Sequence, residues 1–193
     1  MQILVVHLSA GVRVRGDRLN RLKSGDSFEN LSFYRGVSAK YSIDRPCILT
    51  PRRDRRPRNS SPSFHEAADR WFERRFGIRY RSSALFVTSM LLSASTYAGT
   101  PDHVMRIVPL SPYKFCWSPK VSDLLFAEKT LADSDEGQIN SYLDSVGYCE
   151  TGLQEAHDKG HEVMLFCERY AAIPVGMLGE KATSPTVPFI LTK

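Results

Sequence analysis

The chain has 193 residues, of which 42% are hydrophobic and 24% are charged, and this composition is that of an ordinary soluble globular protein. The length predicts one domain, or one domain with an arm, that buries a sizeable core. No apolar run approaches the ~20 residues that a membrane span needs, so we expect no membrane partner. The first eight residues have no basic leader and no convincing cleavage site, which favours a cytoplasmic location without a signal peptide.

Charge is distributed unevenly along the chain. Residues 1–82 contain 18 Lys and Arg against 8 Asp and Glu, whereas residues 83–193 contain 8 against 13. A basic half is usually a solvated face and less often a surface that meets phosphate or an acidic partner. Charge alone leaves both interpretations open.

The four cysteines are widely spaced, with no C-x-x-C pair and no histidine at zinc-ligand spacing. We therefore expect no metal site. Nothing near these residues in the sequence favours a reactive thiolate, so all four are predicted to be reduced and structural. They are Cys47, Cys116, Cys149 and Cys167.

Residues 1–30 are predicted to form an N-terminal arm. Residues 2–8 have the pattern of a strand, but the segment 9–30 is polar and interrupted by glycine, so we expect it to pack poorly. Residues 31–37 are predicted to form a strand that ends at Gly36. Four prolines and five arginines between Arg45 and Ser63 predict an exposed loop without regular structure. The arginines are Arg52, Arg53, Arg55, Arg56 and Arg58.

A helix is predicted after this loop. Ser63 and Glu66 have capping-box spacing, apolar residues recur at helical spacing, and Gly77 provides a C-terminal stop. His65, on this helix, is predicted to be a surface or capping residue.

Strands and short helices are predicted to alternate through the rest of the chain. This pattern indicates an α+β fold with one domain over residues 31–180 and a tail over residues 181–193. Because neither of the two common glycine-rich phosphate-binding motifs occurs, we do not expect a doubly wound nucleotide fold. The predicted strands are 79–89, 103–110, 113–117 (paired with the strand before it), 161–167 and 171–175, and the predicted helices are 91–97, 133–147 and a short one ending at 159.

Three polar groups at predicted strand ends carry the candidate chemistry. Arg35 can hold a phosphate with its planar guanidinium, although its tripeptide alone favours a surface arginine at a strand end. Thr88 and Ser89 can hydrogen-bond a ligand or cap the next helix. Glu162 precedes an apolar strand, where a carboxylate can stabilise a cationic transition state or merely keep a sheet edge soluble.

Together these residues resemble the mono-ADP-ribosyltransferase family of the Arg-Ser-Glu class, which includes bacterial toxins and effectors. The resemblance covers roughly residues 31–176 and implies a split β-sandwich with short flanking helices. It implies that NAD is the substrate, that Arg35 contacts the NAD phosphates, that Thr88 and Ser89 brace the site, and that Glu162 is catalytic. An effector of this kind is delivered into a target cell.

The chain departs from the family pattern at two positions. Val87 stands where the family has the first Ser of its Ser-Thr-Ser motif, so the usual hydroxyl bond to Glu162 is either missing or made by Thr88. Gly160 stands where arginine-modifying members have a second Glu. The resemblance therefore implies an acceptor other than arginine: Thr, Ser, Asn, nucleic acid or water. Some bacterial effectors of this fold modify ubiquitin on threonine, so ubiquitin is one candidate partner.

Further site residues follow from their positions beside these motifs. Asp123 is predicted to replace or assist Glu162, and Gly36 to let the ligand approach the backbone. Four aromatic residues are candidates to stack on the nicotinamide or adenine, although each of them also suits core packing. These are Tyr34, Phe86, Tyr97 and Trp117.

Two other functions remain open on the sequence. An NAD glycohydrolase toxin would have the same fold and use water as the acceptor. A nucleic-acid-binding module would use the Arg52–Arg58 loop together with Arg70, Arg74 and Arg75 on the helix that follows.

Overall fold

The structure is a computed structural model of the chain. It describes residues 27–39, 45–56, 60–131 and 134–177. The predicted strand over residues 2–8 and the predicted tail over residues 181–193 lie outside these ranges.

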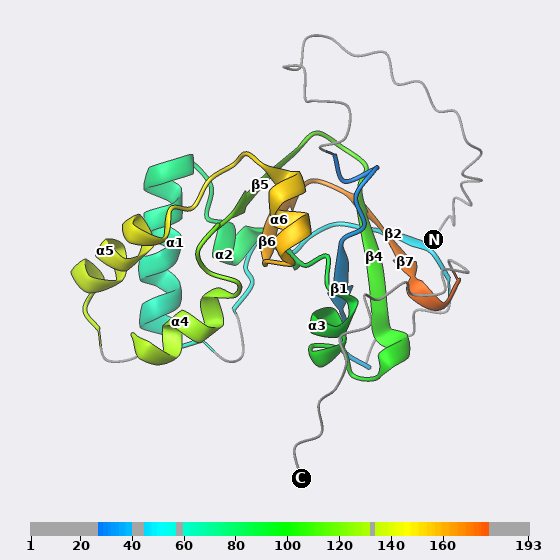
Figure 1. Cartoon of the computed structure of the whole chain (residues 1–193), viewed down its shortest axis with the longest axis horizontal. Coiled ribbons are helices and arrows are strands. Elements are labelled where there is room, and N and C mark those ends of the chain that lie inside the picture. The colour runs from blue at the N-terminus through cyan, green and yellow to red at the C-terminus, as the bar shows by residue number, and fades with distance from the viewer. Residues whose placement is uncertain (1–26, 40–44, 57–59, 132–133, 178–193) are drawn as a thin grey trace.

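Two antiparallel sheets form the β part of an α+β fold (Figure 1). They meet where Tyr34 and Thr88 exchange backbone hydrogen bonds of 2.7 and 3.0 Å. This bridge places the first strand of one sheet beside the first strand of the other. The first sheet has the order β1 (Tyr34–Gly36), β4 (Val104–Pro109), β7 (Tyr170–Pro174) and β2 (Cys47–Leu49), and the second has β3 (Leu85–Val87), β6 (Val163–Cys167) and β5 (Tyr113–Trp117).

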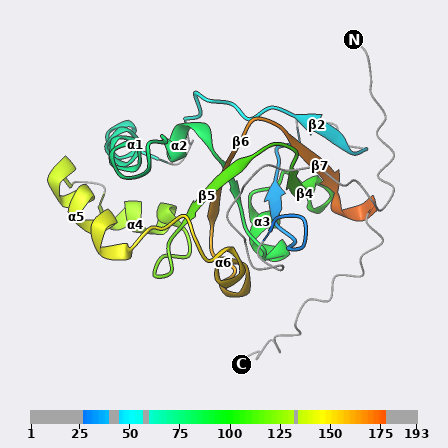
Figure 2. The ribbon, with the colours of Figure 1, turned by 90° about the horizontal axis from the view of Figure 1, so that it is seen from above.

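The predicted pairing of residues 103–110 with residues 113–117 is wrong. β4 pairs with β7 and β5 pairs with β6, in different sheets. The reason is that both connections bend at one corner, where the Leu110 N–H donates to the Arg169 carbonyl at 2.9 Å and the Glu168 N–H to the Ser111 hydroxyl at 3.1 Å. One two-stranded ribbon thus passes from the first sheet into the second, as can be followed in Figure 2.

The first helix, α1 (Pro62–Phe76), begins two residues earlier than predicted. Its N-cap is Ser61, whose hydroxyl accepts a hydrogen bond from the Phe64 N–H at 3.2 Å, so the predicted cap at Ser63 is wrong. The C-terminal stop is confirmed, because Gly77 adopts the left-handed conformation with φ of 73°. A proline at the first helical position explains the early start.

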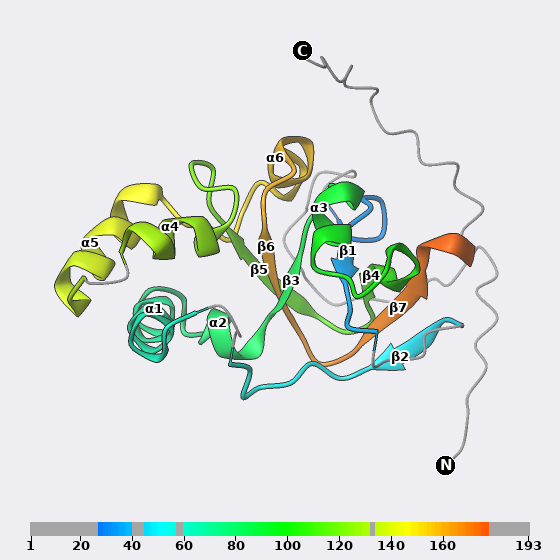
Figure 3. The same cartoon turned by 90° about the horizontal axis from the view of Figure 1, so that it is seen from below.

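The other helices surround the sheets. Helices α1, α4 and α5 lie together at one end of the molecule beside the second sheet, whereas α3 covers β1 (Figures 1 and 3). Residues 80–83, which the sequence predicts as the start of a strand, form the short helix α2, and α4 is a helix that the sequence analysis does not predict. The bounds are α2 (Tyr80–Ser83), α3 (Leu91–Thr96), α4 (Leu124–Thr130), α5 (Glu136–Val146) and α6 (Leu153–Lys159), with 3-10 turns at Pro101–His103 and Val175–Met177.

Two apolar cores lie on opposite faces of the second sheet. Val163 and Leu165 of β6 belong to the core shared with the first sheet and α6, while Met164 belongs to the core under the helices. Phe28 is fully buried in the first core, so the prediction that the arm packs poorly is wrong for this residue. Because successive side chains of β6 point to opposite faces of the second sheet, this strand contributes to both cores.

Candidate functional site

The junction of the two sheets brings together the polar residues singled out in the sequence. Arg35, in the middle of β1, reaches across to β3 and donates from Nη1 to the Phe86 carbonyl at 3.1 Å. β6 runs beside β3 with Val163 opposite Val87, so Glu162 lies next to the end of β3. The Glu162 N–H is held by the Ser122 carbonyl at 2.8 Å. The strands thus place the cation and the carboxylate on either side of β3.

Glu162 has an electrostatic environment suited to proton transfer. The residue is partly exposed. Desolvation, and secondly the negative charge of Asp123, raise the pKa of Glu162 to about 7, while Arg81, Arg55 and a backbone hydrogen bond from Leu124 oppose the rise. A carboxyl group with this pKa exchanges a proton readily near neutral pH.

Asp123 acts electrostatically on Glu162 and is tied into its own hydrogen bonds. Its carboxylate accepts from the Tyr97 hydroxyl at 2.5 Å and from the Leu125 N–H at 2.8 Å. Tyr97 is 54% exposed, and burial of its hydroxyl, the hydrogen bond and the negative charges of Asp123 and Glu162 raise its pKa. Tyr97 therefore stands at the solvent edge of the site and links the end of α3 to the start of α4.

Arg55 is the site residue that sequence reasoning missed. Its N–H donates to the Ser82 carbonyl at 3.0 Å, and its guanidinium carbon lies 3.9 Å from the centre of the Phe86 ring. Burial, followed by the neighbouring charge of Arg35, lowers the pKa of Arg55 to about 9, and the negative charge of Glu162 partly offsets this. Arg55 thus interacts electrostatically with both Arg35 and Glu162.

Most described residues of the predicted loop from Arg45 to Ser63 are exposed, as predicted, and residues 57–59, with Arg58, lie outside the described residues, but the prediction that the segment has no regular structure is wrong. The segment contains β2, which pairs with β7, and two of its arginines lie against the second sheet. Arg53 donates to the carbonyls of Ser83 and Cys167 at 3.1 and 2.9 Å. These contacts join residues far apart in the sequence, so the arginine cluster carried no local signal for them.

Gly36 serves packing in this structure. A Cβ atom there would lie 2.3 Å from the Ala94 carbonyl oxygen and 2.6 Å from the Ala98 nitrogen. The space that the missing side chain leaves is filled by α3, so the expectation that a ligand approaches the backbone at this face is wrong. The close packing places α3, and with it Tyr97, beside β1.

The aromatic candidates divide by burial. Trp117 is 1% exposed and its indole N–H donates to the Thr151 carbonyl at 2.7 Å, so it is a core residue and cannot stack on a ligand. One face of Phe86 is covered by Arg55. Tyr34 is partly buried at the bridge between the sheets. Of these four residues, Tyr97 has the most exposed position.

Thr88 and Ser89 hold the turn between α6 and β6. The Thr88 hydroxyl donates to the Gly160 carbonyl at 2.9 Å and the Ser89 hydroxyl to the His157 carbonyl at 2.5 Å. Of the two alternatives, the one in which Thr88 makes the hydroxyl bond to Glu162 is wrong, because its hydroxyl is directed to the Gly160 carbonyl. The two residues instead fix the backbone from which Glu162 projects.

Gly160 has a structural reason to be glycine. It caps the C-terminus of α6 in the left-handed conformation with φ of 69°. A side chain there would also meet Met90, whose Cγ would lie 2.4 Å from the added Cβ. A second glutamate at this position would therefore be strained.

A buried polar cluster lies between α1 and α2. His65 is only 8% exposed, so its prediction as a surface residue is wrong. The Ser82 hydroxyl donates to Asp69 and lies 3.4 Å from His65 Nε2. Because this hydroxyl donates to the carboxylate and not to the imidazole, the cluster is not a base-activated nucleophile. Asp69 also accepts from the Ser82 N–H at 3.1 Å, which holds α2 against α1.

Arg81 and Glu128 form a second buried pair nearby. They are 2% and 5% exposed, and the closest side-chain atoms are 3.7 Å apart. Ser60 joins them, since it accepts from Arg81 at 2.8 Å and donates to Glu128 at 2.5 Å. This pair anchors the unpredicted helix α4 to α2.

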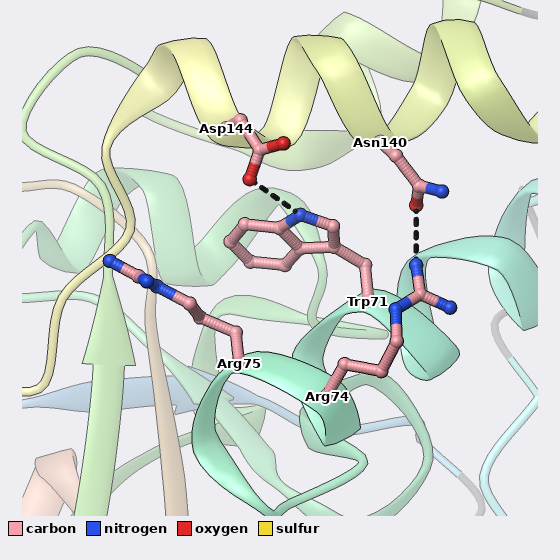
Figure 4. A pocket seen from close by; sticks show the side chains of 5 residues that line it. All are labelled: Trp71, Arg74, Arg75, Asn140 and Asp144. Atoms are coloured by element: carbon pink, nitrogen blue, oxygen red, sulfur yellow. Dashed lines mark hydrogen bonds between the residues drawn. The ribbon is translucent and has the colours of Figure 1, made fainter.

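A hollow of about 350 Å³ lies elsewhere, between α1 and α5 (Figure 4). In it the Trp71 indole donates to Asp144 at 2.9 Å and Arg74 donates to Asn140 at 3.1 Å. Arg75 completes its lining. None of these five residues belongs to the charged group around Glu162, so we assign the hollow no role in the chemistry.

The helix arginines proposed for nucleic-acid contact are partly neutralised. Arg70 forms two hydrogen bonds with Glu136, at 3.1 and 2.8 Å, and Arg74 lies 3.7 Å from the same carboxylate.

Within the described ranges, no group of three or more His, Cys, Asp or Glu side chains is arranged to hold a metal ion. None of the described helices is long and apolar enough to cross a membrane.

Comparison of the chain with models of protein families, with curated proteins and with solved structures found no match.

Proposed function

We propose that this protein is an NAD-dependent mono-ADP-ribosyltransferase with a split β-sandwich fold. The observation that carries the proposal is the placement of Arg35 and Glu162 on either side of β3, with Arg55 in electrostatic contact with both. A guanidinium suits the diphosphate of a dinucleotide, and a carboxylate suits the positive charge that develops on the ribose. NAD presents both groups in one molecule.

In the proposed reaction the bond between the ribose C1′ and the nicotinamide nitrogen breaks. Nicotinamide leaves with the electron pair of that bond, and Glu162 stabilises the oxocarbenium-like ribose. A hydroxyl or another nucleophile of the acceptor forms the new bond to C1′, and its proton passes to the Glu162 carboxylate and then to water. A pKa of about 7 leaves much of Glu162 ionised at neutral pH, as both roles require.

The proposed acceptor is a macromolecule, and arginine is not favoured. Gly160 is required by the end of α6, so the second glutamate of arginine-modifying members has no place here. We propose a Thr or Ser of a protein, for which ubiquitin is one candidate, and a role as a bacterial toxin or effector. Arg35 holds the diphosphate, and Tyr97 and Asp123 line the side from which the acceptor approaches.

Labelled NAD tests this proposal. The wild-type chain, Glu162→Gln and the matched control Glu168→Gln would be incubated with NAD labelled in the adenine part and with a cell lysate. Glu168 is exposed on the turn after β6, so its change removes the same charge away from the site. We expect label on a macromolecule and free nicotinamide with the wild type and the control, and neither with Glu162→Gln.

Mass spectrometry of the products separates transfer from hydrolysis. Free ADP-ribose without a modified acceptor would favour the glycohydrolase alternative. Full activity of Glu162→Gln would refute the assignment of Glu162.

A further inference from the structure

The basic loop places a second arginine in the site. Arg53 is hydrogen-bonded to two carbonyl oxygens and stacks on Phe166 at 4.2 Å, so its charge is used to attach the loop to the second sheet. Arg55, two residues later, has a different environment. Its backbone is fixed by Ser82, but its Nη1 atom is buried and has no hydrogen-bond partner in the part of the chain that the structure describes.

A second buried nitrogen in this neighbourhood is also without a partner. The Nε atom of Arg81 makes no hydrogen bond to any described residue, although the other end of that guanidinium contacts Ser60 and Glu128. Arg81 and Arg55 interact electrostatically with each other, and their guanidinium groups lie 5.7 and 3.9 Å from the same Phe86 ring. Two buried donors that lack acceptors are unusual in a folded protein.

Like charges are also concentrated here. Arg35 and Arg81 both act on Arg55, and Glu162 is the carboxylate that acts on it in return. The guanidinium groups of Arg55 and Arg81 share the Phe86 ring, and Arg35 binds the carbonyl of the same residue, so like charges repel one another where burial weakens the screening by solvent. An anion with several acceptor oxygens would satisfy the unpaired nitrogens and relieve this repulsion at the same time.

We propose that Arg55 is a direct ligand of the substrate diphosphate, with Arg81 Nε beside it, so that the diphosphate lies between Arg35 and Arg55. This inference rests on the proposed function in naming the ligand as the diphosphate of NAD. The arginine-rich segment thereby has a role at the site, and its attachment through Arg53 holds Arg55 in place before the ligand arrives.

Binding of inorganic pyrophosphate tests this subsite without any catalytic step. Its dissociation constant would be measured by calorimetry for the wild-type chain, Arg55→Gln and the matched control Arg56→Gln, which removes the same charge from an exposed neighbour. A charge-assisted hydrogen bond accounts for about a tenfold change in affinity or more. We expect Arg55→Gln to weaken binding at least tenfold and Arg56→Gln to change it less than threefold.

Each other outcome overturns the inference. Equal affinity in Arg55→Gln would show that Arg55 is not a ligand, and tighter binding would show that it fills the site and excludes the anion. Failure of the wild-type chain to bind pyrophosphate would have the same consequence. If Arg55→Gln does not fold, Arg55→Lys takes its place, and its loss of the planar fork should still weaken binding severalfold.

Glu162→Gln separates this inference from the proposed function. It removes the catalytic carboxylate and leaves the arginines, so it should bind pyrophosphate at least as tightly as the wild type. Normal pyrophosphate binding in a chain that never cleaves NAD would refute the transferase and leave Arg55 as an anion ligand. Cleavage of NAD that is unaffected by Arg55→Gln, together with unchanged pyrophosphate binding, would refute the role of Arg55 alone.

Discussion

Replacing Glu162 with glutamine should make the fold more stable while abolishing activity. The pKa of Glu162 is raised from 4.5 to about 7 in the folded chain, chiefly by desolvation and then by Asp123. Between these two values the unfolded chain has lost its proton and the folded chain has kept it. Stability therefore falls as the pH rises through this window, and the full penalty is present above pH 7.

The size of the effect follows from the pKa difference. At 1.36 kcal/mol for each pKa unit, the shift corresponds to about 3 kcal/mol. Because Glu162 is partly exposed, solvent screens part of this cost, and we expect glutamine to raise the free energy of unfolding by ~1–2 kcal/mol at pH 8. Below pH 4 the carboxyl group is neutral in both states, so the difference should disappear.

Urea unfolding at several pH values measures this difference, with tryptophan fluorescence as the signal. Trp71 and Trp117 lie in the two different cores, so loss of either core is detected. Glu168→Gln, at an exposed position, should show no such dependence on pH. A Glu162→Gln chain that is equally or less stable than the wild type at pH 8 would refute the reasoning, because it would mean that the ionised carboxylate is well accommodated.

Three further predictions concern the same region. The rate of NAD cleavage should rise with pH with a midpoint near 7, because the ionised form of Glu162 is the active one, and a kcat/KM profile that is flat between pH 6 and 8 would contradict this. Gly36→Ala should lower the free energy of unfolding by roughly 2 kcal/mol or more, because the new Cβ would lie 2.3 Å from a carbonyl oxygen of α3. Gly176→Ala is the control, because a Cβ there would have no atom within 4 Å, and it should change the free energy of unfolding little. Glu128→Ala should lower the free energy of unfolding, measured with heat or urea, by about 3–5 kcal/mol, because it leaves the buried charge of Arg81 unpaired. A decrease below about 1 kcal/mol would show that water reaches this pair.

The parts of the fold that the sequence predicted are those set by local signals. Gly77 ends α1 in the left-handed conformation, and the apolar spacing of residues 139–146 lies within α5. The one predicted strand pairing, between residues 103–110 and 113–117, is wrong, because the true pairing depends on the corner at which the β4–β5 and β6–β7 connections bend together. Nothing in the alternation of apolar and polar residues shows where a ribbon changes sheet.

The residues of the candidate site also fall into those that short motifs indicate and those that only the fold brings together. Arg35 and Glu162 could be chosen from short motifs because each motif lies on a strand whose position in the sheet is fixed. Arg55 could not, since its place depends on the Ser82 carbonyl and the Phe86 ring, contacts that no spacing in the sequence indicates. Asp123 was found only because it stands near Trp117, and its closeness to Glu162 depends on the fold.

Arg81 and Arg55 differ in how their charges are balanced. Both lie near the same aromatic ring, and both are largely removed from solvent. The charge of Arg81 is balanced by Glu128 at 3.7 Å, which also ties α4 to the rest of the fold. Arg55 forms no ion pair with a described residue, and its neighbours are mostly of the same charge.

A chain selected only for stability would replace Arg55 with an apolar residue on the Phe86 ring, because an unpaired buried donor is costly. Local conflicts of this kind are expected where a site is built for a ligand. Glu162, on the other side of β3, is a second group in an environment that disfavours its charge, as its raised pKa shows. One bound dianion would relieve the repulsion among the arginines and leave Glu162 facing the ribose, so the two conflicts support a single ligand between them.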